Sequence, residues 1–148
     1  MKKLLTALVL GVALTSGCSA QTIGIDIGSI HLPKHEWQHG FNPGVYYVSE
    51  EGLTAGLFLN SIGRVSGLLG VTAEANALAF TVGAVSGYQY KPVGRHTEGS
   101  SPGYITFFLQ GSYRLPFEVM EMHPRVGVIP GFQGTSTVIT FSIERKLN

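Results

Sequence analysis

Cysteine and charge are both scarce in this sequence. It contains one cysteine, Cys18, and charged residues make up only 13% of its 148 residues. A single cysteine excludes a disulfide framework and the paired cysteines of zinc modules. The near-neutral charge balance and the lack of a basic patch argue against a nucleic-acid partner, and the sequence contains no phosphate-binding loop. The length corresponds to one domain.

Glycine and apolar residues are abundant instead. There are 20 glycines, hydrophobic residues account for 44% of the chain and aromatic residues for 10%. No run after residue 20 approaches the eighteen or more apolar residues of a membrane helix. This composition favours an all-β chain with many turns.

The first twenty residues have the pattern of a signal peptide. Lys2 and Lys3 precede the apolar run 4–14, which is too short to span a bilayer as a helix. Cleavage after Ala20 would leave residues 21–148 as one domain without cysteine. The sequence LTSGC also fits a lipoprotein signal, so lipidation of Cys18 is the alternative. In either case we expect the chain to be exported from a bacterial-type cytoplasm.

Period-two alternation predicts β-strands along the rest of the chain. In STVITFSIERK, Ile139, Phe141 and Ile143 share one face, opposite a polar face. We expect eight strands, at residues 22–31, 44–49, 53–59, 65–73, 78–90, 103–110, 117–129 and 137–146. The links at 50–52, 74–77 and 111–116 are short, whereas those at 32–43 and 91–102 are long.

Alternating short and long links are typical of a transmembrane barrel. The sequence therefore predicts an all-β fold, an eight-stranded antiparallel up-and-down β-barrel that spans a membrane. By strand parity, His31, the loop up to Pro43, the stretch 60–64 and the loop 91–102 lie at one end. A soluble barrel of lipocalin type, with its apolar faces turned inward, is the alternative.

The stretch LFLNSIGRVSG (57–67) interrupts two apolar strands with polar residues. Because His31 and Ser61 are expected at the same barrel end, they could supply the base and nucleophile of acyl transfer. Asn60 could orient the imidazole, and Arg64 could stabilise an oxyanion or hold a phosphate. Asn, Ser and Gly are also ordinary turn residues, so a polar turn is the alternative.

The run HLPKHEWQH suggests metal binding, but Pro33 argues against a helix that would gather its histidines. We interpret His35, His39 and His96 as solvated loop residues, and His123 lies in the seventh predicted strand. We therefore expect no metal and no cofactor.

The order of motifs resembles that of the outer-membrane lipid A palmitoyltransferase (PagP-like) family. The similar segments are FNPGVYYVSEEGLTAGLFLNSIGR (41–64), TVGAVSGYQ (81–89) and VIPGFQGTSTVITFSIERK (128–146). Members of the family are eight-stranded barrels that move a palmitoyl chain from a phospholipid to lipid A. The resemblance implies that His31, Asn60 and Ser61 are catalytic, with Asn60 in place of the family's Asp. It also implies substrate contacts from the segment that contains Gly87 and Tyr88, beside the role expected for Arg64.

From this resemblance we expect a monomer in the outer membrane of a Gram-negative cell. Its partners would be phospholipid and lipid A, and its activity would be acyl transfer. Two other functions stay open at this point. One is a non-catalytic outer-membrane barrel that alters envelope properties, and the other is a lipid-anchored barrel that binds an apolar ligand.

Overall fold

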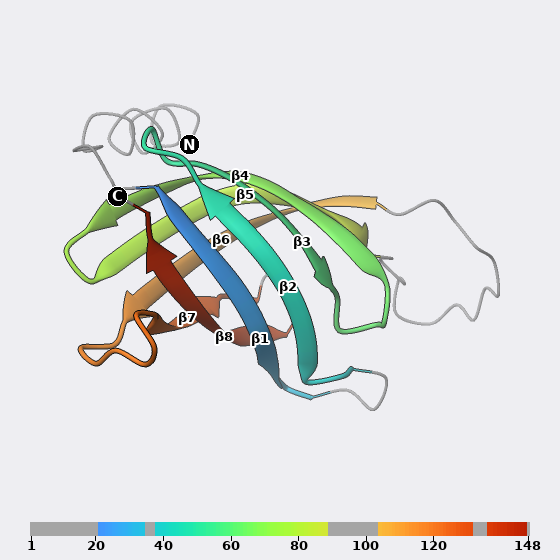
Figure 1. The fold of residues 1–148 in the computed structure, drawn as a ribbon. Helices are drawn as coiled ribbons and strands as arrows, with labels where there is room; N and C mark the ends of the chain where they lie inside the picture. The colour runs from blue at the N-terminus through green and yellow to red at the C-terminus, as the bar shows by residue number, and fades with distance from the viewer. Residues whose placement is uncertain (1–20, 35–37, 89–103, 132–135, 148) are drawn as a thin grey trace, which may run out of the picture.

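A computed structural model describes residues 21–34, 38–88, 104–131 and 136–147. Eight antiparallel strands form a closed barrel in which each strand pairs with its neighbours in sequence and β1 pairs with β8 (Figure 1). This confirms the predicted all-β fold and the eight-stranded antiparallel up-and-down barrel. The predicted signal peptide at 1–20 lies outside the described residues. Within the described part of the chain, no helix is long and apolar enough to cross a membrane.

The strands follow the alternating segments of the sequence closely. They are β1 (Thr22–Leu32), β2 (Phe41–Val48), β3 (Leu53–Leu59), β4 (Val65–Ala75), β5 (Leu78–Tyr88), β6 (Tyr104–Arg114), β7 (His123–Ile129) and β8 (Thr137–Lys146).

Six of the eight strands differ from the prediction in at least one bound, and β6 and β7 differ most. β6 continues to Arg114, and the seventh strand begins at His123 rather than at residue 117. Residues 117–122 form a tight turn instead, in which Val119 and Met122 exchange both backbone hydrogen bonds (2.8 and 3.0 Å). Met120 and Glu121 have positive φ angles of 53° and 62°, the geometry of a tight hairpin turn.

The first and last strands close the barrel along ten ladder positions, from Thr22 opposite Lys146 to Leu32 opposite Thr137. Residues 21 and 147 therefore lie at the same end, which we call the terminal rim (Figure 1). The connections 49–52, 76–77 and 115–122 also lie there. His31 and the turn 60–64 lie at the other end, the His31 rim, as strand parity predicted.

A hydrogen-bonded turn at 49–52 belongs to the terminal rim. Gly52 N donates to Ser49 O (2.9 Å), and Ser49 Oγ donates to the Glu51 carboxylate (2.9 Å). The backbone N–H of Glu51 and the Ser49 hydroxyl together lower the pKa of this fully exposed carboxyl group.

The two faces of the barrel wall differ sharply in polarity. The outward face is apolar: Phe107 and Val65 are 81% and 73% exposed, and most other outward side chains are aliphatic or aromatic. Polar side chains fill the interior instead, and the buried ones are Thr22, His31, Asn42, Thr54, Asn60, Ser61, Ser66, Thr72, Thr81, Arg125, Ser142 and Glu144. The apolar faces therefore point outward, opposite to the lipocalin-type alternative.

Aromatic rings packed on glycines occupy part of the interior. The Tyr46 ring lies where a Cβ on Gly24 would be, and a Cβ on Gly44 would overlap the Phe58 Cβ. A side chain larger than hydrogen would displace the Tyr46 ring at Gly24 and would collide with Phe58 at Gly44. The interior is thus a packed core rather than a wide channel.

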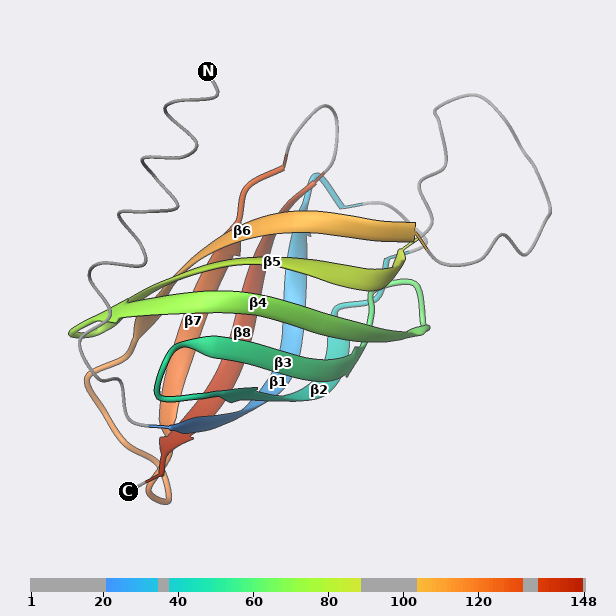
Figure 2. The ribbon, with the colours of Figure 1, turned by 90° about the horizontal axis from the view of Figure 1, so that it is seen from above.

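The seam between β6 and β7 is short. Its ladder runs only from Gly111 opposite Val128 to Arg114 opposite Arg125, whereas β6 pairs with β5 up to Tyr104. Beyond Gly111 the β6 and β7 ribbons diverge toward the His31 rim (Figure 2). In the described residues, the part of β6 from Tyr104 to Gln110 therefore has a β-ladder on one side only.

Candidate functional site

A polar cluster lies inside the His31 rim, built from the ends of β1, β2 and β3. β1 contributes Ser29 and His31, β2 contributes Asn42, and Asn60 and Ser61 follow β3. His39 N donates to Ser61 O (2.8 Å), which ties the chain before β2 to the turn after β3. The structure thus brings the three predicted catalytic residues to one rim.

Asn60 holds the turn that follows β3. Its Oδ1 accepts hydrogen bonds from Ile62 N (3.1 Å) and Arg64 N (2.9 Å). Its Nδ2 donates to Ser66 Oγ (2.9 Å) and to Gly87 O (3.2 Å). Two acceptor and two donor positions of the amide are therefore engaged, and the described contacts give Asn60 the role of a turn residue.

His31 and Ser61 are linked through two intermediate residues. The His31 Nε2 lies 3.2 Å from Ser29 Oγ, and Ser29 Oγ lies 2.6 Å from the Asn42 amide. The Asn42 amide satisfies its neighbours best with Nδ2 toward Ser29 Oγ and Oδ1 accepting from Ser61 N (2.9 Å). A chain of hydrogen bonds therefore runs from the Ser61 backbone to the His31 imidazole.

This orientation of Asn42 determines the direction of the Ser29 hydroxyl. Because Asn42 Nδ2 donates to Ser29 Oγ, the hydroxyl proton is free to point at His31 Nε2. A hydroxyl that donates to an imidazole nitrogen is the arrangement of a nucleophile and its general base. His31 is only 8% exposed, so this pair is shielded from bulk water.

Sequence reasoning missed Ser29 and Asn42. Ser29 stands two residues before His31 in a strand, so period-two alternation places both on one face and could have identified the pair. Asn42 could not be found in this way, because its contact depends on the register between β1 and β2. That register shifts between Asp26 and Gly28, and no pattern in the sequence predicts the shift.

The predicted substrate contacts lie at the same rim. Arg64 is exposed, and its side chain makes no hydrogen bond or ion pair within the described residues. Gly87 has a φ angle of +87°, and a Cβ there would lie 2.6 Å from Ser66 Oγ. Gly87 therefore allows the close contact with Asn60 and Ser66. Tyr88 ends β5, and its side chain lies outside the described part of the structure.

The histidines do not gather within the described part of the chain. His39 is exposed at the His31 rim and His123 starts β7, while His35 and His96 lie outside the described residues. No group of three His, Cys, Asp or Glu side chains within the described ranges could hold a metal ion.

A second polar cluster crosses the interior near the terminal rim. Glu144 Oε1 accepts from Arg114 Nε and Arg125 Nη2, both at 2.6 Å. Glu74 Oε1 accepts from Arg125 Nη2 (2.9 Å) and Arg114 Nη2 (3.2 Å). Tyr46 OH also donates to Glu144 Oε2 (3.3 Å). Two carboxylates and two guanidinium groups thus compensate one another and link β4, β6, β7 and β8.

No model of a known protein family matches this chain, and no curated protein sequence matches it either.

Proposed function

We propose that this chain is an integral β-barrel of a bacterial-type outer membrane. The observation that carries the proposal is the reversed polarity of the barrel, with an apolar outer wall around a polar interior. The closure between β1 and β8 also suits a bilayer, because it pairs the backbone groups of the first and last strands, which water cannot reach there. The signal-peptide pattern of residues 1–20 agrees with export.

Migration in outer-membrane fractions tests this location. A membrane-embedded barrel stays folded in cold detergent and unfolds on boiling, so we expect a band whose mobility changes with heating. The protein should remain in the membrane fraction after an alkaline wash. A soluble periplasmic fraction that contains the folded protein would contradict the proposal.

We further propose that the rim cluster transfers acyl chains between membrane lipids, as the resemblance to the palmitoyltransferase family suggests. His31 Nε2 takes the proton of Ser29 Oγ as this oxygen attacks the ester carbonyl of a donor lipid. The ester bond breaks, and the proton passes from His31 to the departing alcohol. An acceptor hydroxyl then attacks the acyl-serine, again with His31 as base, and frees Ser29.

The short β6–β7 seam supports a lipid path to this cluster. His31 pairs with Val138, and Val138 pairs with Ile129, the residue after the last ladder position of β7. The part of β6 without a β7 ladder therefore begins in the ladder row that contains His31, three strands around the wall. An acyl chain at this seam would approach the catalytic pair from the bilayer.

Mass spectrometry of lipid A and phospholipids, with and without expression, tests the activity. We expect a gain of one acyl mass that both His31→Ala and Ser29→Ala abolish, whereas the exposed-rim control His39→Ala retains it. Loss with Ser61→Ala but not with Ser29→Ala would instead make Ser61 the nucleophile. No acyl change in cells that contain the folded barrel would contradict the catalytic proposal.

Two observations favour a non-catalytic barrel as the second candidate. The hydrogen bonds of the Asn60 amide hold the turn and join it to β4 and β5, and aromatic side chains on glycines occupy part of the interior. Such a barrel would modify the envelope by its presence alone. It predicts a heat-modifiable protein with no acyl change in any lipid class.

A further inference from the structure

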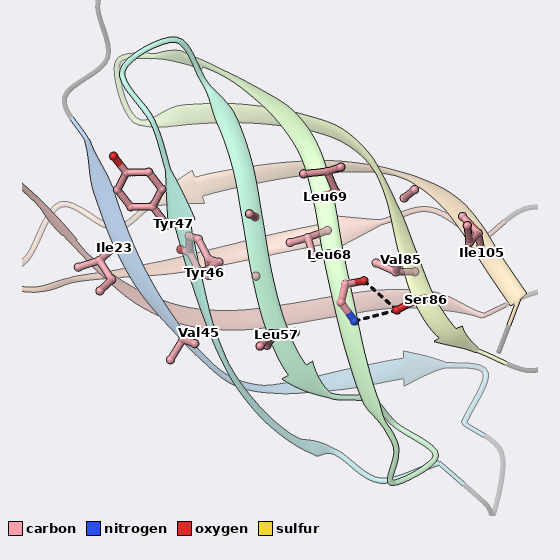
Figure 3. Close-up of a pocket in the computed structure, with 14 residues that line it drawn as sticks. Ile23, Val45, Tyr46, Tyr47, Leu57, Leu68, Leu69, Val85, Ser86 and Ile105 are labelled. Atoms are coloured by element: carbon pink, nitrogen blue, oxygen red, sulfur yellow. Dashed lines mark hydrogen bonds between the residues drawn. The ribbon is translucent and has the colours of Figure 1, made fainter. Parts of the chain in front are cut away.

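A shallow, open groove runs over the outer wall of the barrel across β2–β5 and is bordered by Ile23 of β1 and Ile105 of β6. It has a volume of about 690 Å³, within the ~300–1,000 Å³ of small-molecule sites. Its lining is almost entirely apolar and includes Val45, Ala55, Leu57, Gly67, Leu69 and Ala84 (Figure 3). All six residues belong to the outward face, so the groove opens away from the interior.

Small residues at adjacent ladder positions create the hollow. Leu57 pairs with Gly67, and Leu69 is flanked by Ala55 on one side and Ala84 on the other. Large side chains thus stand beside small ones, and the wall is depressed between them. The Ser86 hydroxyl in the groove accepts from Gly67 N (2.9 Å) and donates to Gly67 O (3.5 Å), as Figure 3 shows. Its polar group is turned to the backbone, which leaves the groove surface apolar.

A positive charge stands at the rim above the groove. Arg64 precedes Val65, which pairs with Leu59 at the rim end of the β3–β4 ladder. The next outward-facing pair of this ladder, two residues further from the rim, is Leu57 with Gly67. The Arg64 side chain is exposed and makes no ion pair with the described residues. Lys34 and His39 share this rim, and its described residues include no carboxylate. The described part of the rim therefore complements an anion.

We propose that Arg64 and the groove together bind one phosphate-bearing membrane lipid, with its phosphate on the guanidinium group and an acyl chain in the groove. At about 3.3 Å per strand residue, Gly67 and Leu69 lie about 10 and 17 Å along β4 from Arg64, the span of an acyl chain beneath a headgroup. An arginine is suited to a phosphate because its guanidinium group donates two parallel hydrogen bonds. The inference rests on the proposed membrane location and is independent of catalysis.

Native mass spectrometry of the folded, detergent-solubilised barrel tests this site. The barrel is mixed with equal amounts of phosphatidylglycerol and phosphatidylcholine that carry the same acyl chains. We expect one bound lipid with a preference for the anionic one of about threefold to fivefold, the range of an exposed charge contact. Arg64→Gln should abolish the preference, whereas Lys34→Gln, which removes another cation of the same rim, should retain it.

Filling the groove with a larger side chain tests whether the groove binds the acyl chain. A Cβ at Gly67 meets only ordinary contacts, 3.4 Å from Ser86 Oγ and 3.9 Å from Leu57 Cδ2, so Gly67→Leu can be accommodated. We expect it to reduce binding of both lipids about equally. Gly111→Leu is the matched control, because Gly111 also lies on the outer wall with only ordinary contacts but outside the groove. Ala84→Leu repeats the test if Gly67→Leu does not fold.

The outcomes separate this inference from the proposed location. One outcome would overturn the lipid site alone: both variants fold and insert into vesicles, but Arg64→Gln keeps the preference for the anionic lipid and Gly67→Leu keeps the binding of both lipids. A dimer that Gly67→Leu dissociates would also overturn it, since a second chain would then occupy the groove. A barrel that stays soluble without detergent would overturn both proposals.

Discussion

At the scale of single residues, Asn60 and Gly87 show how tightly the rim turn is determined. Gly87 lies against Ser66 and accepts a hydrogen bond from Asn60 through its carbonyl oxygen. Asn60 in turn accepts two backbone hydrogen bonds within 60–64. The turn and the end of β5 therefore stabilise each other. A substitution at Asn60 or at Gly87 should weaken both the turn and its contact with β5.

A matched pair of glycine substitutions measures this contact. Gly87 and Gly63 both have positive φ angles, +87° and +76°, but a Cβ at Gly63 meets nothing within 4 Å. We expect Gly63→Ala to cost only the left-handed strain, about 1–2 kcal/mol, and Gly87→Ala to cost at least about 1 kcal/mol more. Urea unfolding in lipid vesicles, followed by the folded band on a gel, measures the difference. Equal losses would show that Gly87 is not crowded.

Replacing Asn60 with Asp tests its structural role. A carboxylate retains the contacts to Ile62 N and Arg64 N but cannot donate to Gly87 O. We expect Asn60→Asp to lower the free energy of unfolding by about 1–3 kcal/mol, the cost of an unsatisfied buried group. The control Gln21→Ala, which removes only a solvent-exposed 3.4 Å contact to Glu50, should change the free energy of unfolding by less than about 0.5 kcal/mol. A more stable Asn60→Asp protein would refute this role.

At the scale of the strands, the β6–β7 seam is the feature with the clearest dynamic consequence. In an antiparallel strand, alternate residues direct both backbone groups to the same neighbour. Every second amide from Tyr104 to Gln110 therefore faces the side that has no ladder among the described residues. This edge should be more open than the β5 side of the same strand.

Hydrogen exchange of the barrel in micelles detects this asymmetry. We expect the β7-facing amides of residues 105–110 to exchange at least about tenfold faster than those of 111–114, which have ladder partners on β7. The β5-facing amides of the same residues serve as the internal control, because their ladder continues to Tyr104. Uniform protection along the β7-facing side would show a closed seam.

The strands were largely predictable from the sequence, whereas the contacts of the site were not. Alternation identified all eight strands, and for residues 53–59 and 137–146 the bounds agree completely. It failed at 117–122, because two residues with positive φ form a turn within an apolar stretch. Parity placed His31 and Ser61 at one rim, but the link through Ser29 and Asn42 depends on a shifted β1–β2 register. Which side chains meet across two strands depends on the register of the pair, and the composition of the strands does not determine that register.

At the scale of the whole molecule, the buried charges hold four strands together. Glu144 and Glu74 each contact both Arg114 and Arg125 across the interior. Removing one member leaves buried charge without compensation, which is costly even where the complete cluster adds little net stability. The cluster should therefore respond strongly to single substitutions and less to paired ones.

Neutralising one carboxylate tests this coupling. We expect Glu144→Gln to lower the free energy of unfolding by about 3–5 kcal/mol, and a second change, Arg125→Met, to recover part of the loss. Glu51→Gln is the control, because the Glu51 carboxylate is exposed in a turn and should have an effect below about 0.5 kcal/mol. Urea unfolding in vesicles compares the variants. Strictly additive losses in the double variant would show that the charges act independently.

The ladder between β1 and β8 also constrains the order of assembly. The ten positions that close the barrel join the strand made first to the strand made last, and Leu147 N donates to Gln21 O (2.6 Å) beside them. The barrel cannot close until residue 146 is available, however early the other hairpins form. Until then β1 and β8 each present an unpaired edge, and these edges are where a chaperone would have to hold the nascent barrel and where two incomplete chains would exchange strands.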